Sequence, residues 1–428
     1  MTPHALSLCA AVSAIRAGEI TSEAYIHSLL ERIEATDPEV RAWVHVDPES
    51  ALRSARACQA QGAGALAGVG IGVKDIIATQ SQPTQFGSPI YAGASAPYDA
   101  ECVTRLQRAG GFVLGKTVTT EFAFMEASKT RNPWRSAHTP GGSSSGSAAA
   151  VACGQVAAAL GTQTNGSVIR PAAFCGVVGF KPTHDALPMA GVGAFSPTLD
   201  TLGVFARNVA DCARLASCLA EDGRISETSP AAAPPRLALL AGYPWTTLDA
   251  TQENAFAQAA AKLRAAGARI DELALPDPCS EAGTVQRTIM FREGAQQLGE
   301  LQSRERGRMS AKLNAALDEG RAVSDGDYRS ALARRAAMIA AATAWLAPYD
   351  AILCAPARGV APADLSQTGD PACCTLWTLL GFPALTIPIA LSEGMPLGLQ
   401  LASIAGADDR LLAVALWCEA RLPFKGLV

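Results

Sequence analysis

The sequence predicts an α/β protein that folds as one large domain. Short apolar segments typical of buried strands alternate with segments of helical period along most of the chain, which favours this class. Of the 428 residues, 49% are hydrophobic and 17% are charged, so the chain can bury an extensive core. Length alone suggests two or three domains. Because strand segments from both ends of the chain are expected around one site, we predict a single domain over 1–428.

The N-terminal region predicts three helices. Two amphipathic helices come first: one ends near Gly18, and the next begins after Thr21 and continues to about Glu34. The apolar run 5–15 has no basic segment before it, so we expect no signal peptide there. A third helix is expected over 47–61, because its aspartate suits the N-cap and the next residue, proline, suits the first helical position.

Strands and helices then alternate on both sides of a linker at 221–235, where Ser-Pro and Pro-Pro steps interrupt regular structure. Before the linker we expect strands at 66–74, 112–114, 155–160 and 177–180, helices at 100–109, 148–152 and 208–219, and loops at 78–97 and 161–167. After it we expect strands at 236–240, 269–273, 351–354 and 384–389, helices at 252–266 and 408–421, and mainly helical structure over 281–346.

Two clusters of glycine and hydroxyl residues, at 141–147 and 161–167, flank a segment of small residues. Glycine permits positive φ and close backbone approach, so such clusters suit turns whose N–H groups point at a ligand. The first cluster matches the G-x-S-x-G nucleophile elbow with Ser144 as nucleophile, but only one histidine, His184, follows that serine. It is also similar to a phosphate-binding loop, but lacks the lysine of that motif.

A third interpretation requires a base other than histidine, and Lys74 is the best candidate. It ends an apolar, glycine-alternating strand segment, so its amine is expected at a buried strand terminus. Moving a lysine pKa from about 10.4 to about 7.5 corresponds to roughly 4 kcal/mol, which apolar surroundings can supply. A neutral lysine then serves as base to a serine. The alternatives are a flexible glycine-serine linker and a surface lysine.

At these residues the chain resembles the amidase signature family. The motifs that carry the resemblance are Gly-Val-Gly-Ile-Gly-Val-Lys-Asp at 68–75, Asn-Pro-Trp at 132–134, the serine-rich block at 139–152, Gly-Ser at 166–167, Ala-Phe-Cys-Gly at 173–176, Gly-Phe-Lys-Pro-Thr at 179–183, Gly-Phe-Pro-Ala at 381–384 and Gly-Met-Pro-Leu-Gly-Leu-Gln at 394–400. The resemblance covers nearly the whole chain and is strongest over 66–203. It implies a mixed, twisted β-sheet with helices on both faces, and a variable helical region at 281–380 that covers the pocket.

Position by position, the resemblance implies a Ser-Ser-Lys catalytic triad. Lys74 takes the place of the family's lysine, Ser143 that of its bridging serine and Ser167 that of its nucleophile. The family also carries a cis peptide bond before the bridging serine, which corresponds here to Gly142–Ser143. The implied oxyanion hole consists of the backbone N–H groups of Thr164, Asn165, Gly166 and Ser167.

Other positions bear on substrate binding or depart from the commonest family pattern. Gln163 stands where most members have an acid, Asn165 replaces a glycine, and Arg170 comes one residue later than the usual arginine. We hypothesise that Arg170 binds a carboxylate or carbonyl of the substrate, as it looks to do in relatives that act on small acidic amides. A structural salt bridge is the alternative. We also expect substrate contacts from Lys116 and Ser144. For Lys116, which we consider together with Glu121, a buried structural pair and surface charges are the alternatives.

The resemblance implies hydrolysis of a carboxylic acid amide through a serine acyl-enzyme, with release of ammonia or an amine and without metal or organic cofactor. Small aliphatic amides, aryl amides, carbamates and ureido compounds are all compatible substrates. Two alternatives stay open. One is the amidase subunit of a glutamine-dependent aminoacyl-tRNA amidotransferase, and the other is a catalytically silent relative that binds an amide.

Composition indicates the partners and the location. The net charge of −4 and the absence of basic clusters argue against nucleic acid as a partner. The 12 cysteines form no C-x-x-C pair and none groups with histidines at zinc-site spacing, so we expect reduced thiols in a cytoplasmic enzyme. The longest candidate for a membrane span, 336–347, stops at Pro348 and is too short. A homodimer is expected by analogy with relatives.

Overall fold

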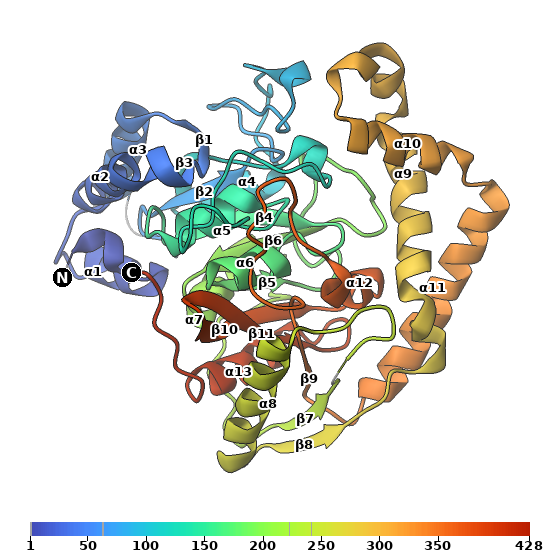
Figure 1. Cartoon of the computed structure of the whole chain (residues 1–428). Helices are drawn as coiled ribbons and strands as arrows, with labels where there is room; N and C mark the ends of the chain where they lie inside the picture. Colours follow the sequence, from blue (N-terminus) through green and yellow to red (C-terminus); the bar gives the residue numbers. More distant parts are fainter. Residues whose placement is uncertain (1, 62–63, 222, 241) are drawn as a thin grey trace.

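The computed structural model describes residues 2–61, 64–221, 223–240 and 242–428. Within these ranges, 11 strands form one sheet in the order β1-β3-β2-β4-β6-β5-β10-β11-β9-β7-β8 (Figure 1). The strands are β1 (Trp43–Val46), β2 (Gly70–Lys74), β3 (Phe112–Thr117), β4 (Ala158–Gln163), β5 (Val178–Lys181), β6 (Thr201–Ala206), β7 (Arg236–Leu239), β8 (Arg269–Glu272), β9 (Ala351–Cys354), β10 (Ala384–Ser392) and β11 (Met395–Ala402). Strands from both ends of the chain thus share one sheet, which confirms the predicted α/β domain.

The sheet is mixed. At one end β2 pairs in parallel with β3 and β4, and at the other β7 pairs in parallel with β8 and β9. The strands between them, β4, β6, β5, β10, β11 and β9, pair antiparallel. Parallel pairing brings the carboxyl ends of β2 and β4 to the same edge of the sheet. Lys74 ends β2 and Gln163 ends β4, so both predicted motif regions meet there.

Helices cover both faces of the sheet, as predicted. They are α1 (Leu8–Arg16), α2 (Ser22–Val40), α3 (Pro48–Gln61), α4 (Glu101–Arg108), α5 (Ser145–Ala152), α6 (Ile169–Cys175), α7 (Val209–Leu219), α8 (Ala250–Ala265), α9 (Ala282–Glu305), α10 (Ala311–Ala322), α11 (Asp325–Leu346), α12 (Ala372–Leu379) and α13 (Asp408–Glu419). On one face α5 and α6 pack against each other and against β4, β5 and β6. On the other face α7 packs against the same three strands, and α1, α4 and α13 pack against α7.

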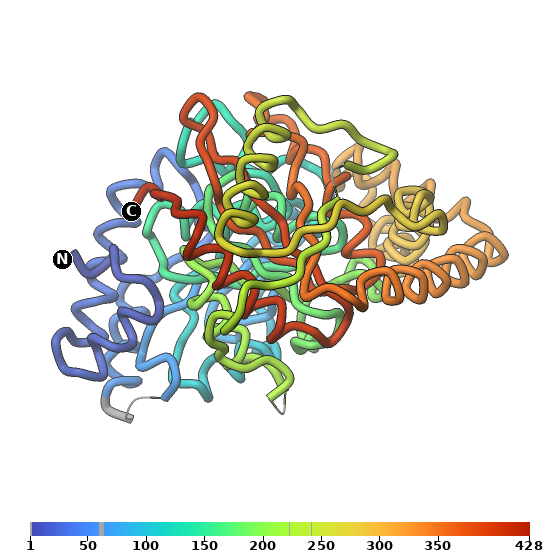
Figure 2. Tube along the Cα trace, turned by 90° about the horizontal axis from the view of Figure 1, so that it is seen from below, coloured from blue at the N-terminus to red at the C-terminus, as the bar shows by residue number. Residues whose placement is uncertain are grey.

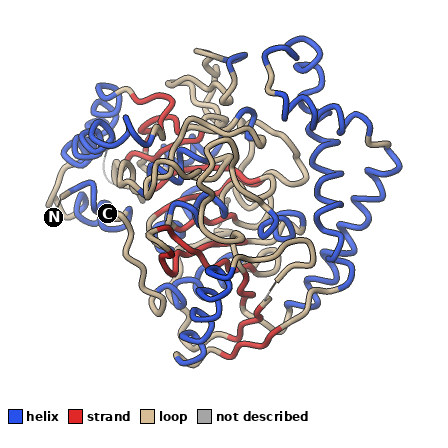
Figure 3. The backbone as a smooth tube through the Cα atoms, viewed as in Figure 1, coloured by secondary structure: helices blue, strands red, loops and turns tan. Residues whose placement is uncertain are grey.

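The region 281–346 is helical, as predicted, and forms α9, α10 and α11. Figure 1 places these helices at one side of the sheet, and Figure 3 shows them as a helical layer beyond the strands. Seen from below in Figure 2, α11 reaches farthest from the sheet. The helix α9 packs against α10, α11 and α12. The bounds of the two regions named within this domain, 66–203 and 281–380, stay predictions.

Several predicted bounds differ from the structure. The helix α2 continues through Pro38 and ends only at Val40, and the capping residue Arg41 adopts the left-handed conformation. The strand predicted at 155–160 is found at 158–163, because residues 153–157 form the turn after α5. The predicted loop 161–167 therefore shrinks to 164–167. The predicted linker 221–235 includes Asp222, which lies outside the described residues; the rest of it forms neither helix nor strand.

Five elements were not predicted: β1, β6, β11, α6 and α12. The hairpin β10–β11 turns at Glu393 and Gly394, both with positive φ, which suits a two-residue turn. In β11 a proline at 396 obscured the strand pattern, and in α6 a proline at 171 obscured the helix. That second proline lies in the first turn, where its missing N–H costs no intrahelical hydrogen bond.

Candidate active site

The strand β2 delivers Lys74 to the centre of the candidate site. Its side chain is fully buried, and its Nζ lies 2.7 Å from Oγ of Ser143 and 2.8 Å from Oγ1 of Thr162. Burial lowers the pKa of Lys74 well below its usual value, and the smaller opposing effect comes from the charge of Asp200. The amine is therefore set up to be neutral and to accept a proton from a serine.

The loop before α5 supplies Ser143. The Gly142–Ser143 peptide bond is cis, as the resemblance implies. The carbonyl of Ser143 accepts a hydrogen bond from the backbone N–H of Thr120 at 3.3 Å, which ties this loop to the segment after β3. Its hydroxyl faces Lys74 on one side and the cavity on the other.

The neighbouring Ser144 lies elsewhere. It is fully buried, its hydroxyl donates to the carbonyl of Thr162 at 3.2 Å, and it accepts from the N–H of Thr162 at 3.3 Å. It does not line the cavity. The structure therefore gives Ser144 neither the predicted substrate contact nor the exposed position that a nucleophile elbow requires.

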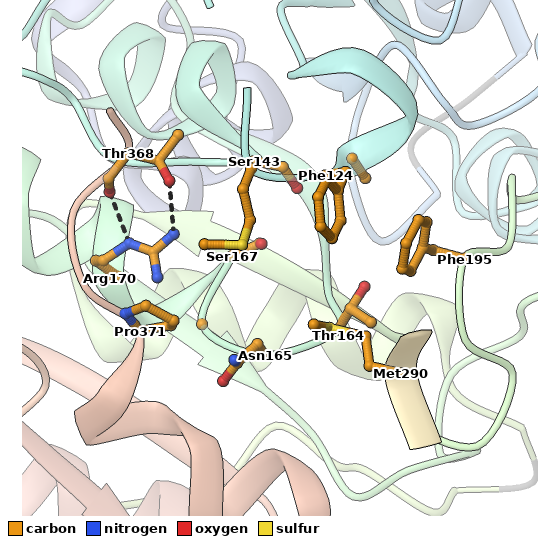
Figure 4. A pocket seen from close by; sticks show the side chains of 13 residues that line it. Phe124, Ser143, Thr164, Asn165, Ser167, Arg170, Phe195, Met290, Thr368 and Pro371 are labelled. Atoms are coloured by element: carbon orange, nitrogen blue, oxygen red, sulfur yellow. Dashed lines mark hydrogen bonds between the residues drawn. The ribbon is translucent and has the colours of Figure 1, made fainter. Parts of the chain in front are cut away.

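The loop between β4 and α6 supplies Ser167. Its side chain lines the same cavity as Ser143, and Figure 4 shows the two serines next to each other. Thr164, Asn165 and Gly166, which precede it, also line the cavity. Among the described residues, no hydrogen-bond acceptor is found for the backbone N–H groups of Asn165, Gly166 and Ser167. This arrangement suits an oxyanion hole.

Side chains from three directions hold the loop 164–167. The hydroxyl of Thr164 donates to Asp200 at 2.6 Å, and burial raises the pKa of Asp200 to about 6. From α12, Thr378 donates to the carbonyl of Asn165 at 2.5 Å. From α9, Gln286 donates to the carbonyl of Thr164 at 3.4 Å. The loop is thus bonded both to the sheet and to the helices that cover it.

Two of the departures from the family pattern, Gln163 and Asn165, both contact α12. The Gln163 Oε1 atom accepts from the N–H groups of Val168 and Ile169 at 2.7 and 3.0 Å, and its Nε2 donates to Thr378 Oγ1 at 2.9 Å. Asn165 accepts a further hydrogen bond, at its Oδ1, from Thr375. A carboxylate at 163 could accept from the two amides but could not donate to the threonine.

In α6, Arg170 is buried and lines the cavity beside Ser167 (Figure 4). Its Nε donates to the carbonyl of Thr368 at 2.7 Å, and its Nη2 donates to the carbonyl of Gly142 at 2.7 Å. Its Nη1 has no hydrogen-bond partner among the described residues, and no described carboxylate forms an ion pair with it. The salt bridge considered as an alternative is therefore not formed. Burial lowers the pKa of Arg170.

Lys116 does not reach the cavity, which contradicts its predicted substrate contact. It is fully buried, and its Nζ donates to Ile77 O, Thr79 Oγ1 and Thr84 Oγ1 at 2.7, 3.0 and 2.8 Å. It also lies 3.7 Å from Asp75, and burial lowers its pKa to about 8. Lys116 is thus buried, but its carboxylate neighbour is Asp75 and not Glu121, which instead accepts from Ser88 and from the backbone N–H of Ser310.

The cavity encloses about 420 Å³ of space between atoms, part of it open to solvent. Its polar side holds the two serines, the 164–167 loop and Arg170, while its apolar side holds Phe124, Phe195 and Met290. None of the described residues that line it is an aspartate or glutamate. Over the described ranges, no group of three His, Cys, Asp or Glu residues is placed to hold a metal ion.

Sequence reasoning missed Thr162, Asp200, Thr375 and Thr378. Thr162 could have been found from the alternation of side chains along β4, because β2 and β4 are parallel neighbours that end at the same edge of the sheet. Nothing in the local sequence marks the two threonines of α12 as site residues, because the site residues they contact lie more than 200 positions away.

The fold, this site and the comparisons define an enzyme that hydrolyses carbon–nitrogen bonds of amides. The amidase family model matches residues 24–412, so the chain belongs to the amidase (amidase signature) family. It is 34% identical to a subunit of the glutamyl-tRNA(Gln) amidotransferase of Chloroflexus aggregans, with 96% of this chain and 95% of the relative covered. None of the helices in the described part of the chain combines enough length with enough apolar character to span a bilayer.

Solved structures agree with this assignment. A crystal structure of an amidase superposes with a TM-score of 0.89 at 30% identity, and covers 98% of this chain and 100% of that one. The peptide amidase of Stenotrophomonas maltophilia superposes with a TM-score of 0.83 at 28% identity, with 99% and 98% covered.

Proposed function

We propose that the protein hydrolyses small amides that carry a carboxylate, through an acyl-enzyme on Ser167. The observation that supports this most directly is the contact between Lys74 and Ser143 at 2.7 Å, on the wall of the cavity that Ser167 also lines. A buried amine beside a hydroxyl provides a base, and the second serine provides the nucleophile.

In this mechanism neutral Lys74 accepts a proton from Ser143, which accepts one from Ser167. The Ser167 oxygen attacks the amide carbon, the C–N bond breaks, and the proton returns through Ser143 to the departing nitrogen. Water then attacks the acyl-enzyme and gives up a proton along the same path. The carboxylic acid is released, and both serines are restored.

The backbone N–H groups of the 164–167 loop would hold the oxyanion. Removal of one such donor costs about 3 kcal/mol in other acyl-transfer enzymes. The N–H groups of Asn165, Gly166 and Ser167 are free for this role within the described structure.

Arg170 would hold the substrate carboxylate. A buried guanidinium without a carboxylate partner is costly, and its planar fork matches a carboxylate. Two of its three nitrogens are fixed by Thr368 and Gly142, and the third has no partner among the described residues. A substrate such as malonamate, whose amide lies one carbon from its carboxylate, would complete this arrangement.

The similarity to a glutamyl-tRNA(Gln) amidotransferase keeps a second function in view. Glutamine carries an ammonium group beside its carboxylate, and a buried ammonium needs an acceptor. The absence of any acidic side chain among the described residues that line the cavity favours a free-standing amidase on acidic amides. Copurification with partner subunits and strict dependence on glutamine would reverse this preference.

We further expect a cytoplasmic homodimer that needs no cofactor. We also expect the protein to hydrolyse amides and not merely to bind them. All 12 cysteines are unpaired, which suits a reducing compartment. Light scattering of the purified protein tests the dimer.

The test of the proposal is ammonia release from malonamate by three proteins. Ser167→Ala should lose activity by at least about 10⁴-fold while it keeps its fold. Ser144→Ala should keep activity within about tenfold, because that hydroxyl is bonded to the backbone of β4. Activity retained by Ser167→Ala in a clean preparation would refute the assignment.

A further inference from the structure

The cavity has an apolar wall that the proposed chemistry does not use. Phe124 comes from the turn after β3, Phe195 from the segment before β6, and Met290 from α9. Their exposed fractions are 6%, 3% and 7%, so only small parts of these side chains face the cavity. No step of the relay and no contact with a substrate carboxylate requires them.

Aromatic packing fixes this wall. The rings of Phe124 and Phe195 stack with their centroids 5.0 Å apart and their planes at 21°. Phe291, next to Met290 on α9, meets Phe124 edge-on at 5.8 Å. Phe195 also lies against Gly294, where a side chain would clash with its ring. A wall held in this way presents a preformed apolar surface to a ligand.

The wall lies opposite the charged side. Figure 4 shows Ser167 between two groups: Arg170 with Thr368 on one side, and the apolar wall on the other. A substrate whose carbonyl carbon meets Ser167 therefore extends in both directions. One end meets a cation, and the other meets apolar rings.

The position of Ser143 decides which end of the substrate faces which side. In Figure 4, Ser143 lies between Ser167 and Phe124. In the proposed relay Ser143 returns the proton to the departing nitrogen, so that nitrogen must lie on its side. The leaving amine then points toward the apolar wall, and the acyl part points toward Arg170.

We propose that Phe124, Phe195 and Met290 form a subsite for an apolar substituent on the amide nitrogen. The preferred substrates are then N-alkyl or N-arylalkyl monoamides of short dicarboxylic acids. Water cleaves the C–N bond, the diacid leaves as its carboxylate, and the nitrogen leaves as an apolar amine that has taken up the proton. This inference rests on the proposed function, because the orientation follows from the serine relay.

Four matched probes test the orientation. Malonamate has the carboxylate and no apolar group, N-benzylmalonamate has both, and N-benzylpropanamide has the benzyl group with a methyl in place of the carboxylate. N-phenylacetylglycine has the same two ends as N-benzylmalonamate with the amide reversed. Benzylamine and ammonia have similar basicities, so a difference between the first two probes reports binding and not leaving-group chemistry.

We expect kcat/KM for N-benzylmalonamate to be at least about tenfold above that for malonamate and above those for the other two probes. Equal or lower values for N-benzylmalonamate would overturn the subsite, and a preference for N-phenylacetylglycine would overturn the orientation. If malonamate is cleaved without benefit from the benzyl group, only this inference fails. If the protein cleaves none of the four, the proposed function fails as well.

The variant Met290→Gln keeps the side-chain length and makes the wall polar. It should lower the ratio of kcat/KM between N-benzylmalonamate and malonamate by about fivefold to tenfold. Met309→Gln is the matched control, because Met309 is 7% exposed and belongs to the same apolar cluster but does not line the cavity. For Met309→Gln, the ratio of kcat/KM between the two substrates should equal that of the wild type. An unchanged ratio in Met290→Gln, with the protein folded by circular dichroism, would contradict the subsite.

Discussion

The two regions that meet at the site, 66–203 and 281–380, contribute different kinds of residue. The first supplies Lys74, Ser143, Thr162 and Ser167, of which the first three are joined by short buried hydrogen bonds. The second supplies cavity-lining residues such as Met290, which take no part in those bonds. The residues of the proposed relay therefore come from the first region, while both regions line the cavity: Phe124 and Phe195 come from the first and Met290 from the second.

The two regions are also bonded to each other at the site. The loop 164–167 belongs to the first region, but Thr375 and Thr378 of the second region bond to it. Arg170 likewise belongs to the first region and is bonded to Thr368 of the second. If the proposed function is right, changes in either region should affect turnover, and those effects can be separated by the variants below.

The largest effect should come from Lys74→Met. Loss of the base should reduce kcat by at least about 10⁴-fold at neutral pH. Wild-type kcat/KM should rise with pH along an acid limb centred well below the usual lysine pKa, because burial lowers the pKa of Lys74. The exposed Lys129 offers the matched control: Lys129→Met should leave the profile unchanged.

Lys74→Met should also change the free energy of unfolding, and the size of this change should depend on pH. Between the lowered pKa and about 10.4, the unfolded chain binds the proton that folded Lys74 does not, so stability rises with pH over this range. Lys74→Met removes this penalty, so its gain in unfolding free energy should be largest below the lowered pKa and should shrink as the pH rises toward 10. A gain that grows with pH in urea titrations would contradict a neutral Lys74.

The next effect concerns Arg170. Arg170→Gln should lower kcat/KM for malonamate by about 100-fold, because a charge-assisted contact from Nη1 is lost, and should lower that for propionamide much less. Arg335 is the matched control, since it donates to the carbonyl of Leu379 and does not line the cavity. Arg335→Gln should keep the wild-type ratio of the two substrates. If Arg170→Gln keeps it too, the arginine has only a structural role.

A smaller effect is expected from the α12 contacts. Thr378→Val removes the hydroxyl that bonds both Asn165 and Gln163, so kcat should fall about tenfold with KM changed less than twofold. Thr386→Val removes a buried hydroxyl of β10 that bonds the carbonyl of Leu399, and should leave kcat unchanged. Equal losses in both variants would show that the effect is general destabilisation.

The smallest effect on activity should come from Tyr328→Phe. Tyr328 on α11 donates to Glu293 on α9 at 2.6 Å, and Glu293 also accepts from Ser196 at 2.6 Å. Its loss should lower the unfolding free energy by about 1 kcal/mol, measured by urea denaturation, with kcat within twofold of wild type. A large fall in kcat would mean that the packing of the cover controls the chemistry directly.

The predictable parts of the fold were those with a strong local pattern. The glycine-alternating run before Lys74 became β2, and the helical period over 281–346 became three helices. Bounds failed where polar residues enter a strand: Thr162 and Gln163 are extended in β4 because buried partners satisfy their side chains. Composition alone favours a loop for such residues.

At the site, the residues of the proposed triad could be selected from the sequence because each lies in a compact motif. The substrate contacts could not, because exposure depends on packing between distant segments. Lys116 and Ser144 have the right chemistry, but both turn away from the cavity. Phe195 and Met290 have no distinctive motif, and they meet at the cavity because α9, which carries Met290, packs against the segment before β6, which carries Phe195.

The central claim, that Ser167 is the nucleophile, is tested most directly by a serine-directed fluorophosphonate. Intact mass and peptide mapping should show one adduct on Ser167 in the wild type and in Ser144→Ala, and none in Ser167→Ala. The adduct should also fail to form in Lys74→Met at neutral pH, since the base is gone. An adduct on Ser144, or one that persists in Ser167→Ala, would contradict the account.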